Sequence, residues 1–211
     1  MKGTVTIPKE VLAQLPGATF DGEIRLIEDE GKLIEAIHYL NGQDTLGFDT
    51  ETRPSFKKGM QNNVSLIQLA TLDHAFLFRI NKTGLHDELV NLIENPDIKK
   101  IGVSLKDDFH NLSKIKEFEP ANFIELQQYG KNFGIADNSL SKIYGIIFGK
   151  RICKGQRLTN WEAETLTETQ QNYAALDAVA CLQIYEHLRS GNFDPFSSPF
   201  YSESSENGEV Q

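Results

Sequence analysis

Apolar residues recur along the chain with two different periods, and these periods predict where strands and helices lie. Short apolar runs are typical of strands, whereas apolar residues three and four positions apart are typical of amphipathic helices. The strands are predicted at residues 23–29, 45–51, 63–71, 74–80 and 98–104. The helices are predicted at residues 29–42, 85–95, 106–118, 138–150 and 167–190, and residues 122–134 begin as a strand and continue as a helix. Strands that cluster early and then mix with helices indicate an α/β fold, with a mixed β-sheet flanked by helices on both faces.

Four segments follow neither period and are predicted to be loops or termini. They are an irregular lead-in at residues 1–21, a loop with Pro, Gly and three basic residues at 52–62, a polar, basic connector at 151–164, and a Ser/Glu-rich segment at 191–211. The composition of the last segment predicts an acidic, disordered tail. We therefore expect one domain at residues 1–190, with its core at about 25–190.

Two acidic residues interrupt the strand-like run TLGFDTE. In an extended strand, Asp49 and Glu51 point to the same face and lie roughly 7 Å apart along the backbone. The side chains of Leu46, Phe48 and Thr50 take the opposite face. A buried, unpaired carboxylate is unfavourable, so these acids must be neutralised by protons, by basic residues or by a metal ion.

Two further acids lie on apolar helix faces. In the last predicted helix, Asp177 falls within the apolar stripe. The stripe consists of Tyr173, Leu176, Ala180, Ile184 and Leu188. In the helix at 106–118, a turn of 100° per residue places Asp108 between Leu112 and Ile115. Asp107 points away from that side, and we assign it only to the dipole at the helix N-terminus.

Taken singly, each of these four acids could be part of a buried ion pair or a hydrogen-bonded cap. Together they are harder to explain in this way, because no apolar stripe contains a matching set of Lys or Arg. Cations from solution are then the natural counterions, and ligation by oxygen atoms alone favours Mg²⁺ or Mn²⁺. Two such ions about 4 Å apart are the usual arrangement for cleaving phosphodiester bonds.

At this point the sequence resembles a known family. The stretches FDTE, GVSLKDDFHNL and NYAALDA look like the three motifs of the DEDD 3′-5′ exonucleases, which have the ribonuclease H-like fold. The spacing of Tyr173 and Asp177 is that of the tyrosine-bearing branch. The resemblance covers roughly residues 25–190 and is closer to Werner-type exonuclease domains than to ribonuclease D.

The resemblance implies catalytic roles for Asp49, Glu51, Asp108, Tyr173 and Asp177. The first two acids and Asp177 would hold one ion, while Asp49 would also contact a second ion, on which Asp108 would act largely through its water shell. The hydroxyl of Tyr173 would orient the attacking water. A 3′-5′ exonuclease of this kind uses two divalent cations, Mg²⁺ or Mn²⁺, and releases nucleoside 5′-monophosphates from nucleic acid.

The net charge of −9 gives little indication of a nucleic-acid partner. Residues 191–211 hold four acids and no Lys or Arg, so the rest of the chain carries −5, and only −1 once four acids are taken as metal ligands. Phosphate binding must therefore come from local cations. The candidates are Arg53, Lys57 and Lys58 in the loop after the first motif, and Lys154 and Arg157 in the connector. Phe56 and Trp161 are candidates for stacking on bases, although packing is the simpler role for Trp161.

Two other functions remain open from the sequence. One is RNA trimming by a ribonuclease D-like enzyme. It stays open because no residue in the sequence can be assigned to recognition of the 2′-hydroxyl group, which distinguishes RNA from DNA. The other is a non-catalytic nucleic-acid-binding protein of the same fold. Such a protein would be expected to have lost one or more of the acids, and all four acids and Tyr173 are present.

The remaining sequence features concern disulfide bonds, zinc sites, the location of the protein in the cell and its partners. Cys153 and Cys181 have no CxxC spacing, and the five histidines show neither HxH nor HExxH spacing, so neither a disulfide nor a zinc site is predicted. The chain has no apolar run of about eighteen residues and no apolar secretion signal, so we expect a soluble, cytoplasmic protein without a membrane partner. The expected partner is a DNA or RNA 3′ end. Neither a helicase nor the C-terminal helical domain of ribonuclease D fits in this chain, which leaves a separate helicase or other protein partner open.

Overall fold

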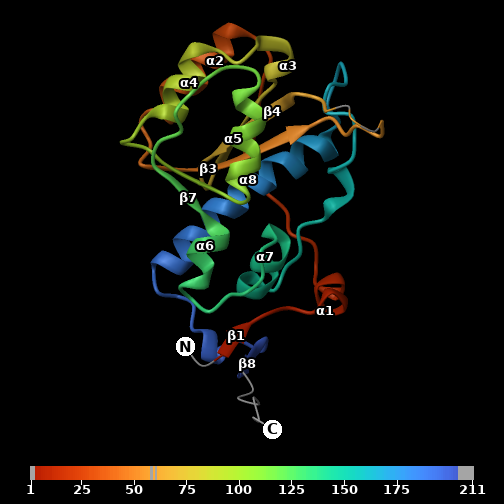
Figure 1. Cartoon of the computed structure of the whole chain (residues 1–211), viewed down its shortest axis with the longest axis vertical. Helices are drawn as coiled ribbons and strands as arrows, with labels where there is room; N and C mark the ends of the chain where they lie inside the picture. Colours follow the sequence, from red (N-terminus) through yellow and green to blue (C-terminus); the bar gives the residue numbers. More distant parts are fainter. Residues whose placement is uncertain (1–2, 58, 60, 204–211) are drawn as a thin grey trace.

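The computed structural model describes residues 3–57, 59 and 61–203, and its centre is a six-stranded mixed sheet (Figure 1). The sheet consists of β2 (Glu23–Ile27), β3 (Thr45–Thr52), β4 (Val64–Ala70), β5 (His74–Phe78), β6 (Lys99–Gly102) and β7 (Phe123–Glu125). The two remaining strands, β1 (Gly3–Val5) and β8 (Tyr201–Glu203), form a separate two-stranded sheet. The order in the sheet is β2-β5-β4-β3-β6-β7. Strand β4 runs antiparallel to β3 and β5, whereas the other neighbours are parallel. The predicted α/β fold with a mixed sheet is confirmed.

Helices cover both faces of this sheet (Figure 1). They are α1 (Lys9–Gln14), α2 (Glu30–Leu40), α3 (Ile80–Thr83), α4 (Asp87–Glu94), α5 (Leu105–Ser113), α6 (Leu126–Lys131), α7 (Leu140–Phe148) and α8 (Glu168–Arg189), with short 3-10 helices at Lys154–Gln156 and Pro195–Ser197. Helices α2, α4 and α5 share one apolar core with one face of the sheet. Helix α8 packs on the other face, together with α6 and α7. Among the described residues, no helix combines the length and the apolar character that crossing a bilayer requires.

Strand β3 divides its side chains between these two layers. Leu46 and Phe48 are fully buried in the core with α2, α4 and α5. On the opposite face, Gly47 approaches α8 so closely that a Cβ atom there would lie 1.9 Å from the carbonyl oxygen of Ala178. Because Gly47 shares its face with Asp49 and Ala178 follows Asp177, this close approach brings the two acids toward each other.

We expect Gly47→Ala to destabilise the fold. The new methyl group meets backbone atoms of α8 rather than a flexible side chain, so the helix must move away from β3. Overpacking of this kind lowers the free energy of unfolding by about 1–3 kcal/mol, which urea denaturation followed by circular dichroism will measure. Gly155→Ala is the control, because nothing lies within 4 Å of a Cβ atom there. A Gly47→Ala protein with an unchanged urea midpoint would contradict this account of the packing.

Both ends of the chain differ from the sequence prediction. The lead-in at residues 1–21 contains β1 and α1. The tail predicted to be disordered at residues 191–211 is ordered as far as Glu203, and β8 pairs antiparallel with β1. Aromatic side chains explain this correction, because Phe193, Phe200 and Tyr201 pack against the core around α8. Residues 204–211 of the predicted tail lie outside the described residues.

Two smaller differences from the sequence prediction concern helices. The helix predicted at residues 106–118 ends at Ser113, and Ile115 lies beyond it with 36% of its surface exposed. Helix α3, a single turn after β5, was not predicted, because four residues are too few to show a helical period.

Candidate active site

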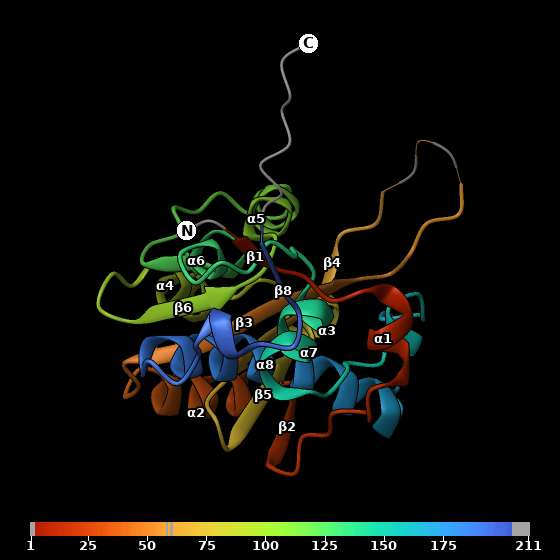
Figure 2. The same ribbon diagram turned by 90° about the horizontal axis from the view of Figure 1, so that it is seen from below.

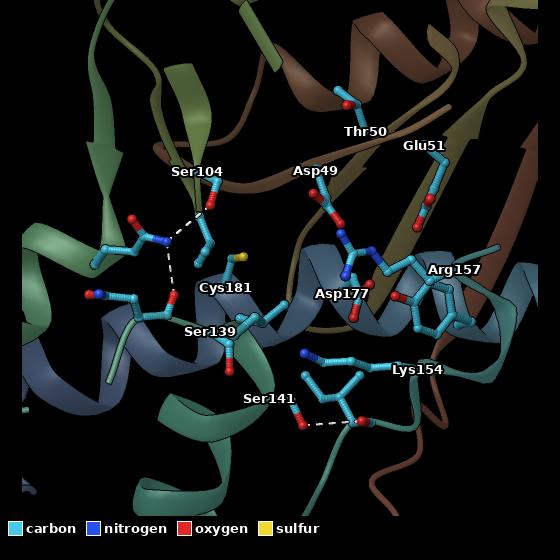
Figure 3. A pocket seen from close by; sticks show the side chains of 16 residues that line it. Asp49, Thr50, Glu51, Ser104, Ser139, Ser141, Lys154, Arg157, Asp177 and Cys181 are labelled. Atoms are coloured by element: carbon cyan, nitrogen blue, oxygen red, sulfur yellow. Dashed lines mark hydrogen bonds between the residues drawn. The ribbon is translucent and has the colours of Figure 1, made fainter. Parts of the chain in front are cut away.

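Three carboxylates from two distant segments meet at the interface of the sheet and α8. Asp49 and Glu51 come from β3 and Asp177 comes from α8, and one oxygen atom of each lies within 4.8 Å of the others (Figure 3). Glu51 and Asp177 are buried, with 7% and 6% of their surfaces exposed. The structure therefore brings together three of the four acids that the sequence singled out.

Burial makes the charged forms of these acids unfavourable. It raises the pKa of Glu51 to about 10, with further contributions from the neighbouring charges of Asp49 and Asp177. It raises the pKa of Asp177 to about 7, and it raises the pKa of Asp49 well above its usual range. None of the ion pairs among the described residues involves these three acids. A converging set of oxygen ligands without an ion-pair partner fits a hard divalent cation.

Asp108 lies beside this cluster rather than within it. Its carboxylate accepts a hydrogen bond of 2.5 Å from the hydroxyl of Thr50, which is on β3 between the two other acids. Burial, and next the charge of Asp49, raise the pKa of Asp108 to about 8. Asp107 is exposed, as the helical periodicity predicted. Asp108 is therefore close enough to Asp49 for the two charges to influence each other, although it is not one of the three converging carboxylates.

Tyr173 lies one helical turn before Asp177 and is half-buried. A hydrogen bond from its hydroxyl lowers the pKa of Asp177, while burial raises the pKa of the tyrosine above its usual range. The hydroxyl therefore stays protonated at neutral pH. The ring of Tyr173 lies 6.2 Å from that of Trp161, measured between centroids. Trp161 is fully buried, so its predicted packing role is confirmed and base stacking by this residue is excluded.

Two of the predicted phosphate-binding cations reach the cluster. Lys154 and Arg157 line the same cavity of about 450 Å³ as the acids, and both extend toward the acids from the connector (Figure 3). Their charges lower the pKa of Asp177. They therefore lie where a phosphate next to the cluster would be held.

Of the other three predicted cations, the two that the structure describes, Arg53 and Lys57, do not line this cavity. Arg53 forms an ion pair of 3.0 Å with Glu162. Lys57 is exposed on the segment that joins β3 to β4, which projects away from the sheet (Figure 2), and Lys58 lies outside the described residues. Phe56, on the same segment, has 85% of its surface exposed and remains available for stacking.

The sequence interpretation missed a polar wall at the other end of the cavity. The side-chain amide of Gln127 donates hydrogen bonds to the Ser104 hydroxyl at 3.0 Å and to the Asn138 carbonyl at 2.9 Å. Ser139 and Ser141 line the cavity on the same side (Figure 3). These residues are uncharged and come from separate segments, so no spacing in the sequence links them. The one local signal is Ser104, which directly precedes α5 and has a left-handed backbone with φ of 63°.

Most of the chain is similar to known proteins. A family described as 3′-5′ exonuclease matches residues 24–191. The mouse bifunctional 3′-5′ exonuclease/ATP-dependent helicase WRN is 34% identical over 155 residues, which cover 71% of this chain and 11% of that protein. A 3′-5′ exonuclease of Arabidopsis thaliana is 30% identical over 169 residues, which cover 75% of this chain and 57% of that protein. The chain thus spans less than two thirds of the length of these relatives.

Solved structures show the same fold. The Nibbler EXO domain of Aedes aegypti superposes with a TM-score of 0.73 at 24% sequence identity, covering 85% of this chain and 96% of that domain. Escherichia coli RNase D superposes with a TM-score of 0.71 at 22% identity, covering 80% of this chain and 44% of that protein.

Proposed function

Since this chain belongs to the 3′-5′ exonuclease family, we propose that its acidic cluster hydrolyses the terminal phosphodiester bond at the 3′ end of a nucleic-acid strand and releases a nucleoside 5′-monophosphate. One observation carries this proposal. Three carboxylates, two buried and one partly buried, have oxygen atoms within 4.8 Å of one another and share a cavity with Lys154 and Arg157. Carboxylates suit divalent cations and the basic side chains suit a phosphate, so the cavity combines the two requirements of metal-dependent phosphodiester hydrolysis.

We propose that the four acids hold two cations, Mg²⁺ or Mn²⁺. Asp49, Glu51 and Asp177 would hold one cation, and Asp49 together with Asp108 would hold the other. When bound, two such ions stabilise the charge that develops on the reacting phosphate and provide a nucleophile at neutral pH. Thr50 fixes the orientation of the Asp108 carboxylate through its hydrogen bond, as residues behind metal ligands commonly do.

The remaining residues bind and orient the substrate. The protonated hydroxyl of Tyr173 would orient the attacking water, which is the arrangement of the tyrosine-bearing branch. Lys154 and Arg157 would hold the phosphate oxygens, and the polar wall around Gln127 would contact the terminal nucleotide. Removal of the proton from water does not fall to Tyr173, because the pKa of its hydroxyl is raised above the usual range.

The substrate that we propose is a single-stranded 3′ end of DNA or RNA. Phe56 and Lys57, both exposed on the projecting β3–β4 segment, can contact the flexible nucleic-acid strand. Both classes of nucleic acid are included because E. coli RNase D is described as an exoribonuclease involved in structured RNA processing, whereas mouse WRN is described as an exonuclease and helicase. A separate helicase as partner of this chain is a further part of the proposal.

A degradation assay tests this function. Single-stranded DNA and RNA, and recessed and blunt duplexes, are labelled at the 5′ end and incubated with the protein in Mg²⁺, Mn²⁺ or EDTA. We expect ladders that shorten from the 3′ end only when metal is present, with nucleoside 5′-monophosphates identified by chromatography. The relative rates rank the substrates. Binding of the same oligonucleotides without cleavage in either metal would instead support a non-catalytic nucleic-acid-binding protein.

A further inference from the structure

A second cavity, of about 420 Å³, adjoins the catalytic cavity on the far side of Tyr173. One wall is a face of α8, the second is the connector before α8, and the third is the N-terminal segment before β2. The residues that line it are Ala18, Thr19, Phe20, Asp21, Cys153, Gly155, Gln156, Thr169, Asn172, Tyr173 and Leu176. Tyr173 lines both cavities, so they are neighbours along α8.

The N-terminal wall lies outside the part of the chain that matches the family. Residues 18–21 precede residues 24–191, which match the family. Backbone hydrogen bonds of 2.9 Å from Ala18 to Arg151 and from Arg151 to Pro16 fix this segment against the connector. The ring of Phe20 folds back over Gly22, where a Cβ atom would lie 2.3 Å from the ring. Phe20 also packs against the cores on the α8 side of the sheet, so its ring is held in place before any ligand binds.

The lining favours a flat ligand that carries no negative charge, because aromatic and apolar surface lies beside uncharged amides and the Asp21 carboxylate. Phe20, Leu176 and the ring of Tyr173 provide apolar surface. Within the described part of the chain, the side-chain amides of Gln156 and Asn172 make no hydrogen bond, so their donors and acceptors are available to a ligand. The described lining residues include no Lys or Arg, which argues against a phosphate. An aromatic face beside free amides is a combination that binds nucleobases.

The connector links this cavity to the catalytic one. Its successive residues alternate between the two, because Lys154 and Arg157 line the catalytic cavity whereas Gly155 and Gln156 line the second. A strand whose phosphate is held by Lys154 and Arg157 therefore has the second cavity next to its backbone. We propose that the second cavity is a subsite for one nucleobase of the substrate strand, close to the scissile phosphate. This inference rests on the proposed function, since it assumes that a nucleic-acid strand occupies the catalytic cavity.

A combination of protein and substrate changes tests the subsite. A series of otherwise identical oligonucleotides carries a single abasic nucleotide at each successive position from the 3′ end, and kcat and KM are measured for each. For the wild-type protein, we expect one internal position at which the missing base lowers kcat/KM about tenfold, mainly through KM. Phe20→Leu retains apolar packing but removes the aromatic face. Asn172→Ala, at an exposed position of α8, removes the amide with little risk to the fold.

In each of these two variants, we expect the missing base at that position to lower kcat/KM by about twofold or less, because the variant has already lost its contact with the base. We call this decrease in kcat/KM the abasic penalty. Phe196→Leu is the matched control, since this aromatic residue is 65% exposed and lies outside the cavity, and it should retain the full abasic penalty. The same abasic penalty in wild type and in both variants, or no internal position with an abasic penalty, would overturn the subsite. If the wild-type protein degrades none of the oligonucleotides, the proposed function itself has failed, which is a different result from either of these.

Discussion

Asp49→Asn is expected to lower the rate of phosphodiester cleavage by at least about 10³-fold while leaving the protein folded. Asp49 is the acid that both proposed cations share, so its loss removes several kcal/mol of charge stabilisation in the transition state, and each ~1.4 kcal/mol changes a rate tenfold. Single-turnover cleavage of a labelled oligonucleotide in saturating Mg²⁺ measures the effect. Asp177→Asn should cause a loss of the same order, because Asp177 lies in the same cluster.

The stability of the Asp49→Asn protein provides an independent check. Burial raises the pKa of Asp49 well above its usual range, so ionised Asp49 opposes folding when no cation is bound. The neutral amide removes this unfavourable charge, and the thermal midpoint in EDTA should be equal to or higher than that of the wild type. Asp107→Asn is the matched control, because Asp107 is exposed and adjacent to Asp108 but is not part of the cluster. Near wild-type cleavage by Asp49→Asn, or loss of cleavage by Asp107→Asn, would show that the acids have been assigned wrongly.

Much of the site was predictable because it depends on periodicity. The strand period of two places Asp49 and Glu51 on one face, and the helix period places Asp177 on the buried side of α8 and separates Asp108 from Asp107. An acid at an otherwise apolar position is a strong indication of a functional site, because burying a charge is unfavourable. The order of the three motifs then supported a family resemblance, which the match over residues 24–191 confirms together with the ribonuclease H-like fold.

What the sequence could not predict depends on contacts between distant segments. Arg53 looked equivalent to Arg157 as a basic loop residue, but its ion pair with Glu162 is made across 109 positions of sequence. The pairing of β1 with β8 joins the two ends of the chain, and each strand alone has only three residues, too few for a clear period. The second cavity likewise depends on the N-terminal segment lying beside the connector. No pattern in the neighbouring sequence distinguishes the residues that make such contacts.

The proposed cations should stabilise the protein, and they should do so more strongly as the pH rises. Without a cation, the pKa is about 7 for Asp177, about 8 for Asp108 and about 10 for Glu51 in the folded protein, compared with about 4 for such groups in an unfolded chain. A carboxyl with a higher pKa in the folded state binds its proton more tightly when folded. Its ionisation therefore has no effect on stability below about pH 4 and increasingly opposes folding as the pH rises toward the folded-state pKa.

A divalent cation reverses this effect, because it binds the ionised carboxylates of the folded protein and competes with their protons. At pH 8 and a metal concentration of about 100 times its dissociation constant, binding adds about 2.7 kcal/mol, which raises the thermal midpoint of a chain of this size by about 5–10 °C. At pH 6, protons occupy more of the cluster, and the increase should be less than half as large. Differential scanning fluorimetry with Mn²⁺ against EDTA at both pH values measures these shifts.

The double variant Glu51→Gln, Asp177→Asn is the decisive comparison, since it keeps the shape of the cluster but removes two of its three charges. Both the stabilisation by Mn²⁺ and its dependence on pH should largely disappear, while Asp107→Asn should behave like the wild type. Equal stabilisation of the wild type at pH 6 and pH 8 would mean that Mn²⁺ binds elsewhere. If Mn²⁺ raised the thermal midpoint of the double variant as much as that of the wild type, this would also show that Mn²⁺ binds elsewhere. The protons displaced by the metal would then not come from these acids.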